Sequence, residues 1–139
     1  MHQFKFRLET VHRLRKRLEN EAKANLASKR NEITAVENDI AQLQRNIDGL
    51  YKSNCTSFND LFMRDIRKSK YDDLIRSNEV TLSILFQEEE KLLEIYLKLK
   101  IELEMINKLE ESERKTWTKE YEKYEQRKLD EFTILRRKN

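Results

Sequence analysis

Apolar residues recur at intervals of three and four along almost the whole chain, the spacing of an amphipathic helix. The first stretch runs from residue 4 to residue 50, and from Ile33 to Leu50 its spacings alternate strictly between three and four. That alternation is the a/d seam of a coiled coil. Between Leu14 and Leu26 the apolar residues step by four each time, which predicts a stutter where the supercoil is straighter and weaker.

A second seam predicts another long helix in the remainder of the chain. It consists of Leu82, Leu85, Leu92, Tyr96, Leu99, Leu103 and Ile106, with Glu89 at the heptad position between Leu85 and Leu92, and continues more weakly through Trp117, Tyr121, Tyr124 and Phe132. Helices of this length need a packing partner, and a short turn between two seams gives an antiparallel hairpin. We therefore expect an all-α fold, a long antiparallel two-stranded coiled-coil hairpin forming a single domain over residues 1–139.

Capping signals divide the chain further. Ser57 with Asp60, and Ser69 with Asp72, have the spacing of N-terminal capping boxes. The predicted elements are a helix over 4–51, a turn over 52–57, a short tip helix over 58–69 and a long helix over 72–136.

The register of the hairpin depends on where the two ends of the chain lie. If Phe4 lies beside Leu135, Leu50 lies near Glu89, and residues 52–88 form an excursion at the tip. The alternative is one uninterrupted second helix that overshoots the first.

Residues 82–109 carry more apolar side chains than a two-stranded seam buries. A neighbouring stripe consists of Phe86, Leu93, Leu97, Ile101, Met105 and Leu109, with Ile84 and Ile95 outside both. The stripe fits either a third packed helix, from segment 58–69 or a second copy of the chain, or a docking site for a partner. The predicted tip offers similar candidates for partner binding: Tyr51, Phe58, Leu61, Phe62, Ile66 and Tyr71.

Composition excludes several fold and function classes. Charged residues make up 40% of the 139 residues, and there is one Gly and no Pro. Sandwiches, barrels and doubly wound folds need many tight turns, and phosphate-binding loops need several glycines. The net charge of only +3, with six Phe and five Tyr, argues against disorder. We expect no membrane span and no signal peptide, and therefore a cytoplasmic protein. We also expect no internal disulfide, because Cys55 is the only cysteine.

No residues have the spacing of a catalytic or metal-binding constellation. The histidines, His2 and His12, lie among cations, and we expect both to be solvated surface side chains. Glu residues four positions from Lys form a solvated, ion-paired helix face. The sequence thus predicts a protein that is not an enzyme and has no cofactor and no metal.

Charge is distributed unevenly along the chain. Residues 1–17 carry six Lys or Arg against Glu9 alone, and Arg136, Arg137 and Lys138 lie near the other end. Residues 87–113 carry nine Glu against four Lys. The basic end favours an acidic protein partner. Nucleic-acid binding is an alternative, but the basic run is interrupted by Leu14, which is unlike a basic-zipper helix.

Two short motifs carry a resemblance to a known family. The opening FKFRLETV (residues 4–11), followed by Leu14-Arg15 and Glu21-Ala22, resembles the N-terminus of the flagellar export protein family FliJ. The closing YEQRKLDE (residues 124–131) resembles the C-terminal signature of that family. Length, the scarcity of Gly and Pro, and the two-helix layout agree with it, whereas residues 52–90 show no matching pattern.

The resemblance implies a cytoplasmic component of the flagellar type III export apparatus, required for flagellum assembly and hence for motility and chemotaxis, and associated with the cytoplasmic face of the inner membrane. The coiled coil would resemble the gamma stalk of rotary ATP synthases. It would bind the centre of the hexameric export ATPase FliI and promote the assembly and activity of that ATPase. It would also contact the export gate protein FlhA and export chaperones. A virulence-type secretion stalk is the alternative. The seams do not fix stoichiometry, so a homodimer stays open.

On this basis the paired chain ends would enter the ATPase ring. The residues expected at that contact are Phe4, Phe6, Arg7, Arg13, Arg17, Leu129, Phe132, Arg136 and Arg137. The apolar tip, together with Phe86 and Leu93, is left for the gate or another partner.

Overall fold

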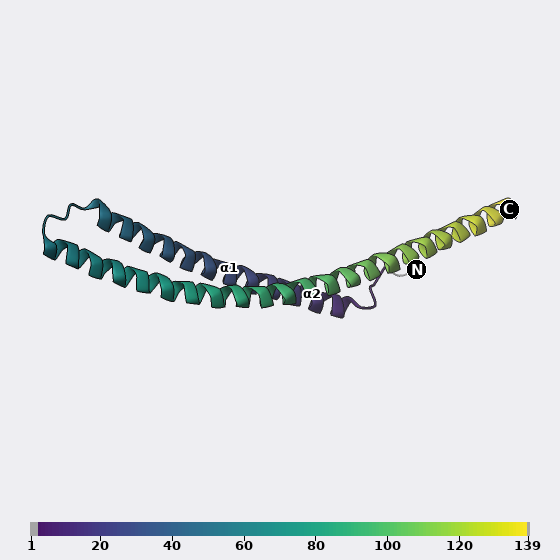
Figure 1. Ribbon diagram of the computed structural model, residues 1–139. Helices are drawn as coiled ribbons and strands as arrows, with labels where there is room; N and C mark the ends of the chain where they lie inside the picture. Colours follow the sequence, from purple (N-terminus) through teal and green to yellow (C-terminus); the bar gives the residue numbers. More distant parts are fainter. Residues whose placement is uncertain (1–2, 139) are drawn as a thin grey trace. The chain divides into compact units, whose positions relative to one another are not determined.

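A computed structural model describes residues 3–138, which form two long helices (Figure 1). Helix α1 spans Glu9–Lys52 and helix α2 spans Phe58–Lys138, and the two are joined by the short segment 53–57. No strand occurs among the described residues. The two helices pack against each other as a hairpin, which confirms the predicted all-α coiled-coil hairpin.

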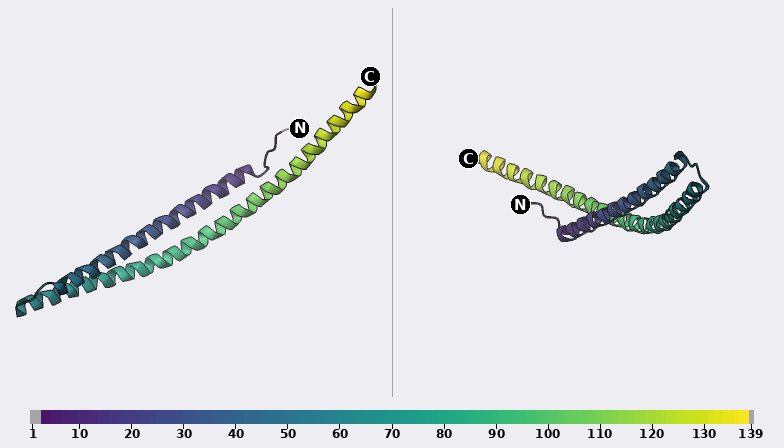
Figure 2. Two further views of the ribbon diagram at one scale, coloured as in Figure 1. Left: turned by 90° about the horizontal axis from the view of Figure 1, so that it is seen from above. Right: turned by 90° about the vertical axis from the view of Figure 1, so that its left-hand side faces the viewer.

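The chain divides into two compact units, each containing part of both helices. Unit 1 comprises Met1–Glu21 with Leu97–Asn139, and unit 2 comprises Ala22–Tyr96, which includes the turn. Within each unit the segments of α1 and α2 run antiparallel and side by side (Figure 2).

Most of the less exposed residues of α1 form a series with alternating spacings of four and three, and the half-buried Leu18, Ala41 and Asn46 lie beside it. The series is His12, Arg15, Glu19, Ala22, Leu26, Lys29, Ile33, Val36, Ile40, Leu43, Ile47 and Leu50. Leu14, which the predicted stutter placed in the seam, is 45% exposed. The stutter is therefore wrong: the heptad spacing continues because polar residues occupy seam positions.

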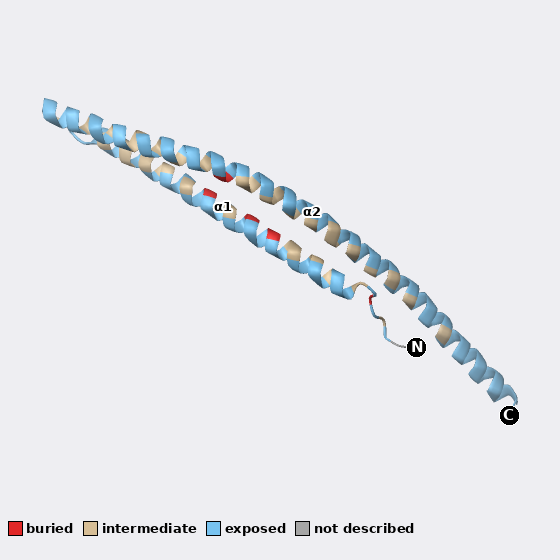
Figure 3. Cartoon of the chain, turned by 90° about the horizontal axis from the view of Figure 1, so that it is seen from below, coloured by how far each residue is buried: buried red, intermediate tan, exposed pale blue. Residues whose placement is uncertain are grey.

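The seam of α2 has the same spacing and confirms the predicted series from Leu82 to Ile106. It begins earlier than predicted, since half-buried positions continue back to Arg64. In the weaker continuation, Trp117 and Tyr124 are half-buried, but Tyr121 and Phe132 are 37% and 63% exposed, so the prediction is wrong at those two positions. Glu89 occupies its heptad position in the seam and is half-buried. In unit 2 the buried parts of both helices lie on the sides that face each other (Figure 3).

Two helix boundaries differ from the prediction. Helix α1 begins at Glu9 and not at residue 4, because residues 3–6 are not helical and residues 7 and 8 form a turn. Helix α2 runs without interruption, so the break expected near Ser69 is wrong, as are the separate helices over 58–69 and 72–136. The capping signal at Ser57 is real, since the Asp60 backbone N–H donates to its Oγ at 3.1 Å. The uninterrupted second helix, the alternative prediction, is the observed one.

The predicted register is also wrong. In unit 1, Phe4 lies against Trp117 and not beside Leu135. In unit 2, the guanidinium of Arg64 lies 4.8 Å from the ring centroid of Tyr51, so α2 returns along α1 directly after the turn. Because residues 52–88 form no excursion, α2 extends beyond the arm in unit 1. Neither helix, over the described residues, is long and apolar enough to cross a membrane.

Candidate protein-binding surfaces

Residues 3–8, here called the arm, precede α1 and are not helical, and residues 7 and 8 form a turn. The sequence of the arm alternates apolar and basic residues: Phe4, Lys5, Phe6, Arg7, Leu8. Phe6 is buried and Phe4 and Leu8 are half-buried, whereas Lys5 and Arg7 are exposed. The arm is joined to the helix by a turn in which the Glu9 N–H donates to the Phe6 carbonyl at 3.2 Å. The period of two explains why this segment is not helical.

Phe4 lies in an aromatic and cationic cluster on α2. Its ring centroid is 6.1 Å from that of Trp117, with the two rings tilted by 59°. The Arg114 guanidinium lies 4.6 Å from the Phe4 centroid, within the range of a cation–π contact. On the next turn, Tyr121 stacks on Trp117 at 5.2 Å. Phe4 therefore contacts a continuous row of side chains along one face of α2.

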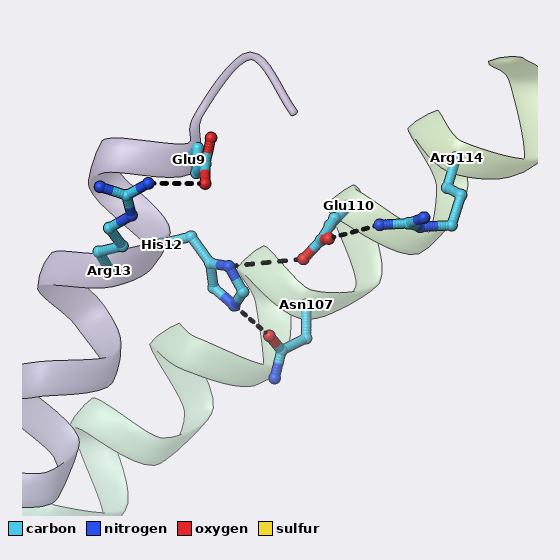
Figure 4. Close-up of polar contacts among 6 residues, drawn as sticks. All are labelled: Glu9, His12, Arg13, Asn107, Glu110 and Arg114. Carbon is cyan, nitrogen blue, oxygen red and sulfur yellow. Dashed lines mark hydrogen bonds and ion pairs between the residues drawn. The ribbon is translucent and has the colours of Figure 1, made fainter. Parts of the chain in front are cut away.

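The second cluster of unit 1 is centred on His12 (Figure 4). Its Nε2 lies 2.7 Å from Asn107 Oδ1 and its Nδ1 lies 3.4 Å from Glu110 Oε2. Arg114 Nη2 donates to Glu110 at 3.3 Å, and the Phe6 ring meets the imidazole edge-on at 6.1 Å. The side chain of His12 is only 16% exposed, so the expectation of a solvated surface histidine is wrong for His12. His2 lies outside the described residues.

Two ion pairs to α2, one from α1 and one from the arm, complete unit 1. Arg15 Nη1 donates to Glu102 at 2.6 Å, and Arg7 Nη2 lies 3.5 Å from Glu113. Part of the basic N-terminal segment is thus paired with the acidic segment 87–113 of the same chain. The two opposite charge balances were visible in the sequence, but only the observed register brings them together. This pairing weakens the nucleic-acid alternative.

Beyond Trp117, residues 118–138 of α2 extend past the arm; we call this segment the overhang (Figure 1). Its large apolar side chains are exposed: Leu129 59%, Phe132 63%, Ile134 54% and Leu135 63%. They lie next to the cations Arg136, Arg137 and Lys138, which are also exposed. A solvent-exposed apolar helix surface of this kind is typical of a protein-binding site.

Two side-chain contacts within the overhang perturb titration. A hydrogen bond to Glu125, together with the negative charge of that carboxylate, raises the pKa of Tyr121. A hydrogen bond with Tyr124 raises the pKa of Lys128, whose Nζ lies 4.9 Å from the Tyr124 ring centroid. The overhang therefore holds part of its polar surface in place by contacts within one helix.

Comparison with protein families decides the classification. The family model described as flagellar FliJ protein matches residues 4–139, nearly the whole chain. The chain belongs to the flagellar FliJ family. No curated protein and no solved structure matches the chain significantly. Membership assigns this FliJ-family protein to flagellar export in general and confirms the resemblance carried by its two terminal motifs.

The residues expected at the ATPase ring do not form one site in this FliJ-family chain. Phe4, Phe6 and Arg7 belong to the arm: Phe4 and Arg7 contact α2, and Phe6 contacts His12 of α1. Arg13 and Arg17 pair with Glu9 and Glu21 on α1 itself, at 2.8 and 3.8 Å. Leu129, Phe132, Arg136 and Arg137 lie on the overhang. In unit 1 the arm reaches α2 near Trp117, about three turns before Leu129.

In unit 2 the turn carries an apolar cluster at the start of α2, which we call the tip. Phe58 is 84% exposed, Phe62 54%, Leu61 41% and Ile66 38%. Tyr51, at the end of α1, is 50% exposed and Tyr71 is half-buried. The spacing of Phe58, Leu61, Phe62 and Ile66 places them on adjacent positions of one helix surface.

The stripe beside the α2 seam is also exposed. In unit 2, Phe86 is 48% exposed and Leu93 is half-buried. In unit 1, Leu97, Ile101 and Met105 are 46%, 53% and 65% exposed. Segment 58–69 cannot cover the stripe, because it belongs to the same continuous helix. Over the described residues, no group of three or more His, Cys, Asp or Glu is arranged to hold a metal ion.

Proposed function

We propose that this FliJ-family protein is a non-enzymatic stalk and adaptor of the flagellar export apparatus, whose overhang binds in the central hole of the hexameric export ATPase FliI and promotes its assembly and activity. The observation that carries the proposal is the continuation of α2 past the arm. The overhang presents exposed apolar side chains and a basic end, whereas the arm beside Trp117 packs against its own chain.

The chemistry of the overhang suits insertion into a ring. A single helix is narrow enough to enter a central hole, about 10–12 Å across with its side chains. Leu129 and Phe132 offer apolar contacts, and Arg136 and Arg137 offer charge to acidic loops. Charge complementarity of this kind raises the association rate and suppresses wrong partners. From the sequence, both chain ends were expected to enter the ring together. The proposal now assigns this role to the end of α2 alone.

The ring contact is tested by charge reversal with a matched control. Arg136→Glu with Arg137→Glu should abolish stimulation of ATPase activity while helicity, measured by circular dichroism, is unchanged. The control is Arg13→Glu with Arg17→Glu, which changes the same charge at positions paired within α1. It should retain more than half of the stimulation. Equal stimulation by wild type and by the overhang variant would reject insertion of the overhang.

We propose that the tip of unit 2 contacts the export gate protein FlhA, at the cytoplasmic face of the inner membrane, and that export chaperones bind the chain in the same assembly. Support comes from Phe58 and Phe62, which are large and strongly exposed on the first turns of α2. Phe58→Ser with Phe62→Ser should abolish pull-down of the gate protein and leave ATPase binding intact. Val80→Ser with Ile84→Ser, at positions 63% and 52% exposed in the same unit, is the control.

A further inference from the structure

The surface under the arm, formed by α2 and by His12 of α1, has the features of a peptide-binding site. We infer that it binds a non-helical segment of another protein with the order aromatic, any residue, aromatic, arginine, and that the arm occupies it in the free chain. This inference does not depend on the tip or on the apolar and basic side chains at the end of the overhang. It therefore goes beyond the proposed function and can fail independently of it.

Three adjacent contacts define what the surface accepts. The first aromatic position, Phe4, lies between the Arg114 guanidinium and the Trp117 ring. The second, Phe6, is buried to 7% exposure with its ring against the His12 imidazole. The arginine position, Arg7, faces the carboxylate of Glu113 at 3.5 Å. The chain itself therefore shows which peptide the surface fits.

The ligand that this surface holds is not helical. The arm has no helical structure at Phe4 and Phe6, and Arg7 lies in the turn before α1. A surface pocket lined by Phe4, Lys5, Phe6, Glu9, His12, Glu110 and Arg114 lies at this contact. Its polar groups, the His12–Glu110–Arg114 cluster, contact one another without the arm between them.

The arm is held by few contacts. Phe4 and Arg7 contact α2, and the buried Phe6 contacts His12 of α1. Phe4 is only half-buried and the Arg7 side chain is 73% exposed, and an exposed ion pair contributes little stability, so a peptide with the same side chains can compete for these contacts. Tyr121, 37% exposed, extends the aromatic row past Phe4 and offers a further stacking face to a longer ligand.

The test uses the full chain with the arm disabled, Phe4→Ala and Phe6→Ala, and the blocked hexapeptide QFKFRL as the probe. Trp117 is the only tryptophan, so its emission reports on this surface alone. We expect the Trp117 emission of the arm-disabled chain to change saturably as the peptide is added. Half-saturation should need about tenfold less peptide than for wild type. The reason is that in wild type an arm that covers the surface about nine-tenths of the time raises the apparent Kd of the peptide about tenfold. Anisotropy of a fluorescein-labelled peptide gives a second readout.

Controls separate this inference from other effects. The peptide QAKARL should not bind either chain. Phe4→Ala alone leaves the buried Phe6 in place and should give an intermediate half-saturation. This variant guards against loss of structure at the start of α1, and circular dichroism measures the helicity of each variant. Absence of saturable binding to the arm-disabled chain in both readouts would overturn the inference, and so would equal half-saturation for wild type and variant. Neither result would affect ATPase stimulation by the overhang.

Discussion

The two units of the chain use the same heptad spacing but different chemistry. In unit 2 the seam contains the buried side chains Ala22, Leu26, Ile33 and Leu85, which are 4–9% exposed. In unit 1 seam positions hold His12 and Arg15, and among the described residues of that unit only Phe6, from the arm, is a buried hydrophobic residue.

The difference indicates a division of roles. Buried apolar area is the main stabilising contribution in a hairpin of this kind. Ion pairs at seam positions contribute little net stability but disfavour other registers, because a shifted helix would leave their charges without partners. Unit 2 therefore supplies stability, whereas unit 1 fixes the pairing and leaves the α2 surface beyond it available.

The largest expected effect comes from emptying the seam of unit 2. Ile33→Ala removes a side chain that is 4% exposed and should lower the free energy of unfolding by about 2–4 kcal/mol. Ile101→Ala in unit 1, at a 53% exposed position, should change it by less than about 0.5 kcal/mol. Urea unfolding followed by circular dichroism measures both. Similar losses for the two variants would break the comparison between the units.

The Arg15–Glu102 pair tests the role of charge in unit 1. Arg15→Met leaves Glu102, whose side chain is 31% exposed, without its partner and should cost about 1 kcal/mol. The double variant, Arg15→Met with Glu102→Leu, should recover wild-type stability or exceed it, because apolar replacements of ion pairs are often neutral or stabilising. A double variant less stable than Arg15→Met would show that this ion pair, and not apolar packing, holds unit 1 together.

Gly49 offers a stabilising change in unit 2. It lies inside α1, and a Cβ added there would meet no atom within 4 Å. Gly49→Ala should raise the free energy of unfolding by about 0.5–1 kcal/mol, since glycine is a poor helix former. Gly49→Val, a weaker helix former than alanine, should gain less. A loss of stability in thermal melts of Gly49→Ala would contradict the open surroundings of this position.

The smallest effect concerns Lys29 in unit 2. Hydrogen bonds to Glu88 at 2.7 Å and Glu32 at 3.2 Å raise the pKa of Lys29 above its ordinary value of 10.5. Because the pKa of Lys29 is higher in the folded chain than in the unfolded chain, its contacts stabilise the folded chain fully at pH values below 10.5. This contribution is lost as the pH rises through the pKa of Lys29 in the folded chain.

An arginine at position 29 keeps its charge in this range. The stability difference between Lys29→Arg and wild type should therefore be constant at about pH 7–9 and shift in favour of arginine above about pH 10.5. Lys23→Arg, at an exposed position of α1, is the control. Equal pH profiles for all three chains would show that the Glu88 contact does not persist in solution.

The sequence predicted the fold from the periodicity of Ile33–Leu50 and Leu82–Ile106, because a long apolar seam constrains a helix pair strongly. It failed where polar side chains occupy seam positions, as His12 and Arg15 do, since periodicity counts only apolar residues. The opposite charges of residues 1–17 and 87–113 were recognised, but the two segments were not paired with each other when the register was predicted.

The candidate surfaces were predicted less well. The apolar tip residues Phe58 and Phe62 were named from composition and are strongly exposed. Phe4 and Phe6 were assigned to a partner, whereas the structure packs Phe4 against Trp117 of α2 and Phe6 against His12 of α1. The clue was their period of two, which departs from the helical spacing of the residues that follow. The family match confirms the flagellar resemblance that the two terminal motifs carried.

Hydrogen exchange by mass spectrometry, on the full chain alone and with the export ATPase, tests the central claim most directly. In the free chain, amides of residues 22–50 should exchange most slowly and those of 9–21 and 118–138 faster, because exchange reports local stability. Adding the ATPase should slow exchange in 118–138 and leave 22–50 unchanged. New protection confined to unit 2, or none at all, would contradict a stalk anchored by unit 2 that binds through its overhang.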